Sequence, residues 1–441
     1  MAATERPQHY EASPGQGKYI DIAVSSGEVA QARNYLTFAP RARLFRHHLP
    51  NGASFHVAVN DTIFSRGRPS HALGGIRVDT RSSATPIEAS DTLASDLASD
   101  MGPKYLTLHE MLERADAPES VREAARHDGG KAVLRVTNPA VLEESQREET
   151  FGRIGMLIRG MNGLYVPGAD MGTDAHDMST IARAAGEGVD VSCQEGEIPN
   201  SEITAVGVFH AVKATIEHQR ENNVAGWDKE DPIMTFQGLG NVGQPLLLRL
   251  MQQYPEMRFN LLETNQEKVA QTLQKLREHG IAEDRIRENL KQVDANDVEE
   301  IRASLEESDG FIPNAGPNVI THSTIDALRE GAIYVGAAND IIPKVDGVDD
   351  PTILARTKSK GIVGVAAYQA NCGGIAAIAV QDAGGTQADA ERYMEGVHAL
   401  VKDTLAEAAE RDLSPETVAI ERTHRHFARY VKAKEIDLRA A

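Results

Sequence analysis

The amino-acid sequence predicts an α/β protein of two domains, the second of which is built on a doubly wound parallel sheet. Three observations support this fold class. The chain has 441 residues, which corresponds to two or three domains of roughly 100–200 residues each. From about residue 201 onward, short apolar segments alternate with helical patterns, as βαβ units do. A glycine-rich turn at 238–243 lies between a predicted strand and a predicted helix.

The composition is that of an ordinary globular protein, with 41% hydrophobic and 25% charged residues. Because 65 acidic residues outnumber 46 basic ones, the net charge is −19, which disfavours binding to nucleic acid or to anionic membranes. The two cysteines, Cys193 and Cys372, exclude a disulfide scaffold and a cysteine-based zinc site, and we predict no metal. The chain has neither an apolar run of membrane-spanning length nor the apolar core of a secretory signal. We therefore expect a cytoplasmic protein.

The first half of the chain shows the patterns of a smaller α/β domain. Residues 1–18 are polar, contain proline and glycine, and are predicted to be a loose leader. Alternating apolar residues bounded by Gly, Asn and Pro predict strands within 19–80. Apolar residues at helical spacing predict three helical ranges in this half, and one more apolar run predicts a further strand. The predicted helical ranges are 86–126, 139–163 and 175–187, and the further strand is 131–137.

The second half alternates more regularly. A long amphipathic helix is predicted at 201–219, followed by a strand, the glycine turn and a helix within 232–253. The next strand and helix are predicted at 258–265 and 267–280, with further apolar runs at 310–315, 332–339 and 361–367. The charged stretch 284–309 is predicted to be solvated helix. Long helices rich in Ala, Glu and Arg are predicted from about Thr386, and we expect them to pack back on the first domain.

The glycine turn has the G-x-G-x-x-G spacing of a dinucleotide-binding site. Each glycine has a physical role: the first allows the tight turn, the second lets a pyrophosphate approach the backbone, and the third permits close packing of helix on strand. The N-terminus of the following helix would face the phosphates with unpaired N–H groups. The turn residues predicted to bind the cofactor are Gly238, Gly240, Asn241, Val242 and Gly243.

Glu263 extends this motif. It ends the next predicted strand, twenty residues after Gly243, where a carboxylate would accept hydrogen bonds from the ribose hydroxyls. The same carboxylate would repel a 2′-phosphate, so NAD is favoured over NADP. Alone, the glycine pattern also fits a purely structural turn, but strand, turn, helix and acid occur here in the expected order. The sequence therefore predicts a Rossmann-type NAD-binding domain.

Three features of the first half are candidates for chemistry. Lys131 follows a glycine turn at the start of an apolar strand, Lys104 lies in a helical pattern after Gly-Pro, and Asp170 precedes Gly-Thr in a loop. Each has an ordinary alternative. A lone lysine on a turn is usually a solvated charge, and an aspartate before Gly-Thr is usually a turn or helix-capping residue.

Taken together, a series of short motifs resembles the glutamate/leucine/phenylalanine/valine dehydrogenase family, and more closely its leucine and phenylalanine branch. The motifs occur in the family's order from about residue 45 to 385. They are ALGGIRV (72–78), MGPK (101–104), GGKAV (129–133), GADMGT (168–173), SEITAVGV (201–208), QGLGNVG (237–243), GAAND (336–340) and NCGG (371–374). The resemblance implies reversible oxidative deamination of an L-amino acid to a 2-oxo acid and ammonia, with reduction of NAD. It also implies a homo-oligomer.

The resemblance also implies a division of the chain. Residues 1–200 would form the substrate-binding, catalytic and oligomerisation domain, residues 201–370 the Rossmann domain, and residues 371–441 a hinge and C-terminal helices. Lys131 resembles the catalytic lysine, which activates water for attack on the imine, and Asp170 the carboxylate that exchanges protons with the amino group. Lys104, assisted by backbone at Gly74 and Gly75, resembles the group that binds the substrate carboxylate. Residues resembling those around the nicotinamide and its ribose are Thr204, Asn339 and Asn371.

Four positions bear on which amino acid is the substrate. Glutamate-specific members of the family place a lysine where this chain has Leu73 and a serine where it has Ile378. A substrate carboxylate facing these two side chains would be desolvated without a partner. Ile375 adds another apolar position, and Gly168, where leucine-type members carry alanine, leaves room for a ring. We expect an apolar substrate. The space at Gly168 is compatible with a large or aromatic one, and the alternative is that Gly168 serves only a turn.

Two departures from the family pattern keep alternatives open. Relative to the family pattern, residues 106–127 are an insertion between Lys104 and Lys131, and Asp128 replaces a third glycine. The inserted segment would then serve as a lid, a specificity element or an oligomer contact. A dehydrogenase for glutamate or another specialised amino acid, and a non-catalytic NAD-binding regulatory homologue, are the alternative functions.

Overall fold

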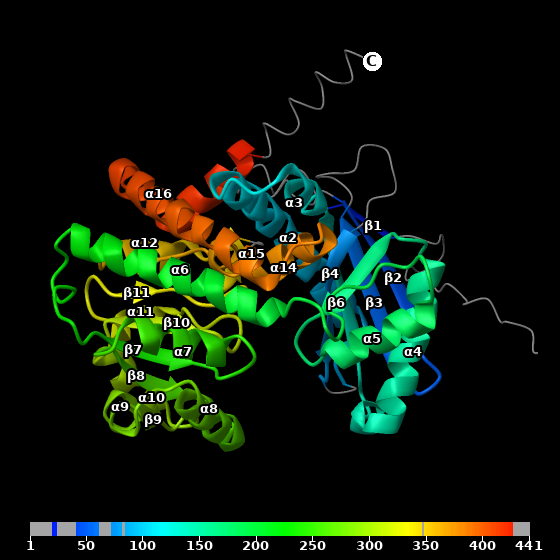
Figure 1. Ribbon diagram of the computed structural model, residues 1–441, viewed down its shortest axis with the longest axis horizontal. Helices are drawn as coiled ribbons and strands as arrows, with labels where there is room; N and C mark the ends of the chain where they lie inside the picture. Colours follow the sequence, from blue (N-terminus) through cyan, green and yellow to red (C-terminus); the bar gives the residue numbers. More distant parts are fainter. Residues whose placement is uncertain (1–19, 24–40, 61–71, 82–83, 346–347, 427–441) are drawn as a thin grey trace, which may run out of the picture. The chain divides into compact units, whose positions relative to one another are not determined.

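A computed structural model describes residues 20–23, 41–60, 72–81, 84–345 and 348–426. The predicted leader at 1–18 lies outside these residues. The chain divides into two compact units. Residues 1–106 and 123–198 form the first unit, and residues 107–122 and 199–441 form the second. Figure 1 labels the elements of both units. Among the described residues, no helix combines the length and apolar character needed to cross a membrane.

The first unit contains a mixed six-stranded sheet with the strand order β1-β2-β3-β5-β4-β6. Strands β1, β2, β3 and β5 pair antiparallel, whereas β4 is parallel to both β5 and β6. The strands are β1 (Ile20–Ala23), β2 (Arg41–His48), β3 (Ser54–Asn60), β4 (Ala72–Asp79), β5 (Asp128–Arg135) and β6 (Tyr165–Ala169). Every residue of β5 is buried, so this strand is the centre of the unit.

The helices between and after these strands follow in sequence order. They are α2 (Glu88–Arg114), α3 (Glu119–Ala124), the short 3₁₀ helix η1 (Pro139–Leu142), α4 (Glu144–Gly160) and α5 (Ala175–Ala185). Leu97 and Ala98 of α2 pack against Val133 of β5 and Ala58 of β3, which fixes α2 on one face of the sheet. Helices α4 and α5 approach closely, because Gly155 has no side chain to hold Ile181 away.

The second unit contains a parallel six-stranded sheet with the order β14-β11-β10-β7-β8-β9. Read from β9, this is the strand order of a Rossmann fold. The strands are β7 (Ile233–Gln237), β8 (Arg258–Leu262), β9 (Leu290–Val293), β10 (Gly310–Pro313), β11 (Ile333–Tyr334) and β14 (Val363–Gly364), and a separate hairpin joins β12 (Lys344–Val345) to β13 (Val348–Asp349). The predicted α/β architecture with a doubly wound second sheet is confirmed.

The helices of the second unit follow in sequence order. They are α6 (Asn200–Glu221), α7 (Gly243–Gln253), α8 (Gln266–Glu278), α9 (Glu283–Asn289), α10 (Val298–Glu306), α11 (His322–Ala327), α12 (Pro351–Ser359), α13 (Ala367–Ala370), α14 (Gly373–Asp382), α15 (Gln387–Tyr393) and α16 (Glu395–Arg411), with a last helical segment at 415–426. The C-terminal helices α14 and α16 pack on α6 within this unit. The domain boundaries drawn at residues 200 and 370 stay a prediction.

One sequence expectation needs correction. The charged stretch 284–309 is not continuous helix, because the strand β9 separates α9 from α10 and forms the edge of the second sheet. Two of its four residues are exposed. An edge strand of this kind lacks the buried apolar run by which inner strands are recognised.

Candidate functional site

The first unit holds a buried ion pair between Lys131 and Asp170. Lys131 Nζ lies 2.7 Å from Asp170 Oδ2, and the two side chains are only 7% and 17% exposed. Lys131 is in the middle of the buried strand β5, and Asp170 directly follows β6. The structure thus brings together the two residues predicted to be catalytic, and Lys131 is not a solvated turn lysine.

Asp170 is held from several sides. Arg77 Nε donates to the same Oδ2 atom at 3.1 Å, and the backbone N–H of Asp170 donates to Thr173 Oγ1 at 2.8 Å. Burial alone would raise the pKa of Asp170, but the positive charges of Lys131 and Arg77 outweigh it and hold the pKa well below its usual range. Helix α5 is capped by Asp174 and not by Asp170. Asp170 is therefore a charged carboxylate held between two cations.

The register of the sheet places the predicted substrate residues on one face. Leu73 of β4 pairs with Gly129 of β5, and Gly75 pairs with Gly168 of β6. Because side chains alternate along a strand, Leu73, Gly75 and Gly168 share the face on which Lys131 lies. Arg77, two residues after Gly75, points to the same face and completes the group.

The glycine pair is required by close approach. A Cβ on Gly74 would overlap the carbonyl oxygen of Gly130, and a Cβ on Gly75 would lie 2.6 Å from the Asp170 Cβ. Two backbone carbonyl oxygens of this segment are fixed as well. Tyr165 Oη donates to the Gly74 carbonyl at 2.6 Å, and Tyr105 Oη donates to the Leu73 carbonyl at 3.2 Å. This backbone is thereby held rigidly beside Asp170.

Lys104 lies on α2, half-buried, on the helix that covers this face. The helix approaches β5 at Gly129, where a Cβ would lie 2.7 Å from the Ala98 carbonyl oxygen and 2.8 Å from the Met101 Cβ. Asp128, which stands in place of the family's third glycine, is buried at the start of β5. The structure therefore places Lys104 on the helix above the strand that carries Lys131.

In the second unit, the glycine turn has the geometry that its spacing predicts. Gly238 directly follows β7 and has a φ of +87°, a conformation that side chains disfavour. Gly243 begins α7, and a Cβ there would overlap the Gly238 carbonyl oxygen. At Gly240, no atom of the part of the chain that the structure describes lies within 4 Å of a Cβ position. Asn241 is exposed and Val242 half-buried between these glycines. The turn thus offers open space at the point where a pyrophosphate would approach the backbone.

Glu263 lies beside this turn. It follows β8, and its Oε2 accepts a hydrogen bond from the Leu239 backbone N–H at 2.8 Å, while its Oε1 accepts one from the Asn265 backbone N–H at 2.9 Å. Burial opposes ionisation, but these backbone donors prevail and lower the pKa of Glu263. A charged carboxylate therefore lies at the end of β8, where the sequence predicts recognition of the ribose.

Asn371 and Asn339 form a second polar group in this unit. Asn371 Nδ2 donates to Asn339 Oδ1 at 2.7 Å and to the Ala337 carbonyl at 2.9 Å. Asn371 Oδ1 is buried and accepts no hydrogen bond from the described residues. The same holds for Gln237 Oε1, in the last residue of β7. Buried acceptors of this kind need donors, and a bound carboxamide or ribose hydroxyl would supply them.

Thr204 is near Asn371 because α14 begins against α6. A Cβ at Gly374 would lie 3.2 Å from Thr204 Oγ1, and one at Gly373 would overlap the Ile203 carbonyl. Thr204 Oγ1 donates to the Asn200 carbonyl at 2.8 Å. Ile375 and Ile378 lie on the first turns of α14, with Ile375 buried and Ile378 half-buried.

Two residues with a place in these sites were not singled out from the sequence. Arg77 is in the ALGGIRV motif, two residues after Gly75. Because residues two apart on a strand lie on the same face of the sheet, this spacing could have placed Arg77 beside the substrate residues. Gln237 precedes the glycine turn, and its position at the carboxyl end of the central strand β7 was the signal there.

No family model matches the chain. The chain is similar to the leucine dehydrogenase of Geobacillus stearothermophilus, with 27% identity over 296 residues that cover 67% of this chain and 71% of the relative. It is also similar to the phenylalanine dehydrogenase of Thermoactinomyces intermedius, with 25% identity over 288 residues, or 65% and 70% of the two chains.

Solved structures share the fold. The L-tryptophan dehydrogenase of Nostoc punctiforme has a TM-score of 0.58 and 19% identity, covering 92% of this chain and all of the other. The hetero-hexameric glutamate dehydrogenase of Thermus thermophilus has a TM-score of 0.58 and 16% identity, covering 87% and 88% of the two chains.

Proposed function

Because this chain belongs to the glutamate/leucine/phenylalanine/valine dehydrogenase family, we propose that it oxidatively deaminates an apolar L-amino acid, with NAD as the hydride acceptor. The products are the 2-oxo acid, ammonia and NADH, and the reaction is reversible. The observation that carries this proposal is the buried pair of Lys131 and Asp170. A purely structural NAD-binding protein has no use for such a pair on the face that carries Gly75 and Gly168.

The described residues fit NAD. The open position at Gly240 and the buried acceptors Asn371 Oδ1 and Gln237 Oε1 support its binding, and the charge of Glu263 favours a ribose without a 2′-phosphate. When bound, NAD accepts the hydride from the substrate Cα, and the protein contributes position and electrostatics. Loss of that hydride converts the amino acid to an imine.

Lys131 and Asp170 then handle protons. In the proposed reaction, Lys131 first gives its own proton to solvent and then takes a proton from water as the water oxygen adds to the imine carbon. The resulting carbinolamine loses ammonia as its hydroxyl proton leaves, which gives the 2-oxo acid. Asp170 accepts a proton from the substrate ammonium and returns one to the departing amine. The two groups are coupled, because a neutral Lys131 no longer stabilises the Asp170 carboxylate and so makes it a better base.

An apolar substrate is supported by the side chains at the specificity positions. Leu73, Ile375 and Ile378 offer no charge or hydrogen bond to a substrate carboxylate. A buried carboxylate without a partner costs several kcal/mol, so glutamate should be a poor substrate. We also propose that the enzyme is a cytoplasmic homo-oligomer.

The function is tested by following NADH formation with each of the twenty amino acids. We expect turnover with apolar amino acids and little with glutamate. Preference for glutamate would contradict the pocket assignment. NADH binding without turnover of any amino acid would instead favour a regulatory homologue.

Replacing Glu263 with serine should change the cofactor preference toward NADP. Loss of a charge-assisted hydrogen bond removes about 1.5–3 kcal/mol of binding to NAD, and loss of the charge removes repulsion of a 2′-phosphate. The ratio of kcat/KM for NAD to that for NADP should fall by about 10-fold or more. Glu267→Ser, at an exposed position on α8, is the matched control. An unchanged ratio in Glu263→Ser would show that the ribose is recognised elsewhere.

Replacing Gly168 with alanine should favour smaller apolar amino acids. The new methyl would lie 3.3 Å from Cys193 Sγ, and no other atom of the described residues lies within 4 Å of it. It therefore fits with a small adjustment and occupies space on the Lys131 face. One methyl in an apolar pocket contributes roughly 1–3 kcal/mol, so the kcat/KM ratio of phenylalanine to leucine should fall about 10-fold.

Gly152→Ala, on the open surface of α4, should leave that ratio unchanged. If Gly168→Ala slows all substrates equally, Gly168 serves the strand and not the pocket.

A further inference from the structure

The segment inserted between Lys104 and Lys131 meets the end of the described chain within the second unit. His109 and Glu113 are one helical turn apart on α2, which places them on one face of the helix. His426 comes from the last helical segment, 415–426. One donor atom from each of the three side chains lies within 4.8 Å of the other two.

The three side chains form a ligand set for a transition metal. Two imidazole nitrogens and one carboxylate oxygen are donors that Zn²⁺ and similar ions prefer. At metal–ligand distances of about 2.0–2.2 Å, the donor atoms of one ion are roughly 3–4 Å apart. The three donor atoms would therefore need to move closer by only about an ångström, which rotation of the side chains allows. The two imidazole rings are 6.5 Å apart between centroids and tilted by 37°, and they need not stack to converge on a common point.

The burial pattern suits a site with one open side. His109 and His426 are only 1% and 4% exposed, whereas Glu113 is exposed. The imidazoles therefore line the inner wall, and the carboxylate lies at the solvent edge. Three protein ligands leave a fourth tetrahedral position for a water molecule.

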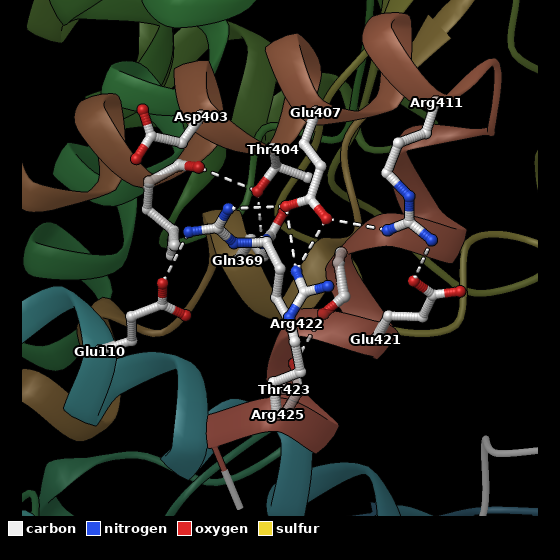
Figure 2. A network of polar contacts seen from close by, with 12 residues as sticks. Glu110, Gln369, Asp403, Thr404, Glu407, Arg411, Glu421, Arg422, Thr423 and Arg425 are labelled. Atoms are coloured by element: carbon white, nitrogen blue, oxygen red, sulfur yellow. Dashed lines mark hydrogen bonds and ion pairs between the residues drawn. The ribbon is translucent and has the colours of Figure 1, made fainter. Parts of the chain in front are cut away.

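A neighbouring ion-pair network holds the two helices in register (Figure 2). Arg422, one turn before His426, contacts Glu110 Oε1 at 2.8 Å and Glu407 Oε2 at 3.1 Å. Glu110, adjacent to His109, also contacts Arg114 at 3.0 Å. Of these contacts, the one between Arg422 and Glu110 joins the last segment to α2 beside the candidate ligands. Little further ordering is needed to bind an ion, which favours binding.

We infer that His109, Glu113 and His426 bind a divalent transition-metal ion of the zinc type, which clamps the inserted part of α2 to the helical segment 415–426. The site uses neither NAD nor an amino acid, so it stands independently of the dehydrogenase reaction. This site was not predicted from the sequence, because His426 is far from the other two residues along the chain and the metal expectation rested on cysteines.

The inference is tested on the full-length chain stripped of metal by a chelator and titrated with Co²⁺, which reports tetrahedral nitrogen and oxygen ligands by its visible absorption. We expect one Co²⁺ per chain, displaced by Zn²⁺, and a melting temperature that rises with Zn²⁺ concentration. Removing even an outer-shell partner of a metal site weakens binding about 10–100-fold. Glu113→Gln and His426→Gln should therefore raise the Kd by at least about 10-fold.

The exposed Glu113 makes Glu113→Gln the deciding variant, because its fold should persist even if His426→Gln is unstable. His176→Gln, which alters an exposed histidine 3.5 Å from Glu195, and Glu306→Gln on α10 should both bind like the wild type. Absence of Co²⁺ absorption in the wild type, wild-type affinity in Glu113→Gln, or loss of binding in His176→Gln would each overturn the inference.

Discussion

Replacing Lys131 with methionine is expected to lower kcat by about 10²- to 10⁴-fold, the usual contribution of a positioned acid–base group. Methionine retains the apolar stem of the side chain in β5 but cannot take a proton from water. NADH binding, measured by fluorescence, should remain at the wild-type level, because the glycine turn and Glu263 are in the other compact unit.

The Lys131→Met variant also tests how the charges of Lys131 and Asp170 are balanced. Without Lys131, Arg77 is the one cationic partner of Asp170 that remains among the described residues, so the pKa of Asp170 should rise. Lys291→Met, at an exposed position on β9, is the control for loss of one positive charge. Turnover of Lys131→Met within a few-fold of the wild type would contradict the catalytic assignment.

Replacing Asp170 with asparagine should reduce kcat by a similar factor, about 10²- to 10⁴-fold, and should also destabilise the first unit. The carboxylate is 17% exposed and balances two cations. Removing one partner of a buried pair costs about 3–5 kcal/mol, so a clear decrease in melting temperature is expected. Asp190→Asn, at an exposed position of the same unit, should leave both quantities unchanged.

The stability difference between wild type and Asp170→Asn should depend on pH. The folded-state pKa of Asp170 is lowered, so the carboxylate stabilises the wild type above the unfolded-state pKa of about 3.9. This contribution is lost as the pH falls from there through the folded-state pKa. Urea unfolding at several pH values should therefore show a difference that is constant near neutrality and shrinks below about pH 4. A difference independent of pH would mean that the ionised carboxylate is not what stabilises the fold.

The sequence predicted those parts of the structure that depend on local pattern. The turn at Gly238, Gly240 and Gly243 has a spacing that only a few backbone geometries satisfy, and the structure has the positive φ, the open position and the close approach expected of it. Lys131 and Asp170 were identified by motif, and the parallel pairing of β4 with β5 and β6 brings their strands together.

What the sequence did not predict depends on contacts between distant segments. The role of Arg77 became visible only through its hydrogen bond to Asp170, 93 residues away in sequence. Likewise, Ser90 and Asp91 in α2 contact Asp79 and His56, which are 11 and 35 residues away in sequence. No periodicity in a single sequence encodes such pairings, because each is selected by the packed tertiary structure.

Hydride transfer from an apolar amino acid to NAD is the central claim, and isotope labelling tests it most directly. The best substrate of the amino-acid panel would be supplied with deuterium at Cα, and the NADH formed would be analysed by mass spectrometry together with the ammonia released. The account predicts one deuterium in each NADH and one ammonia for each NADH. Unlabelled NADH, or NADH formed without ammonia, would contradict it.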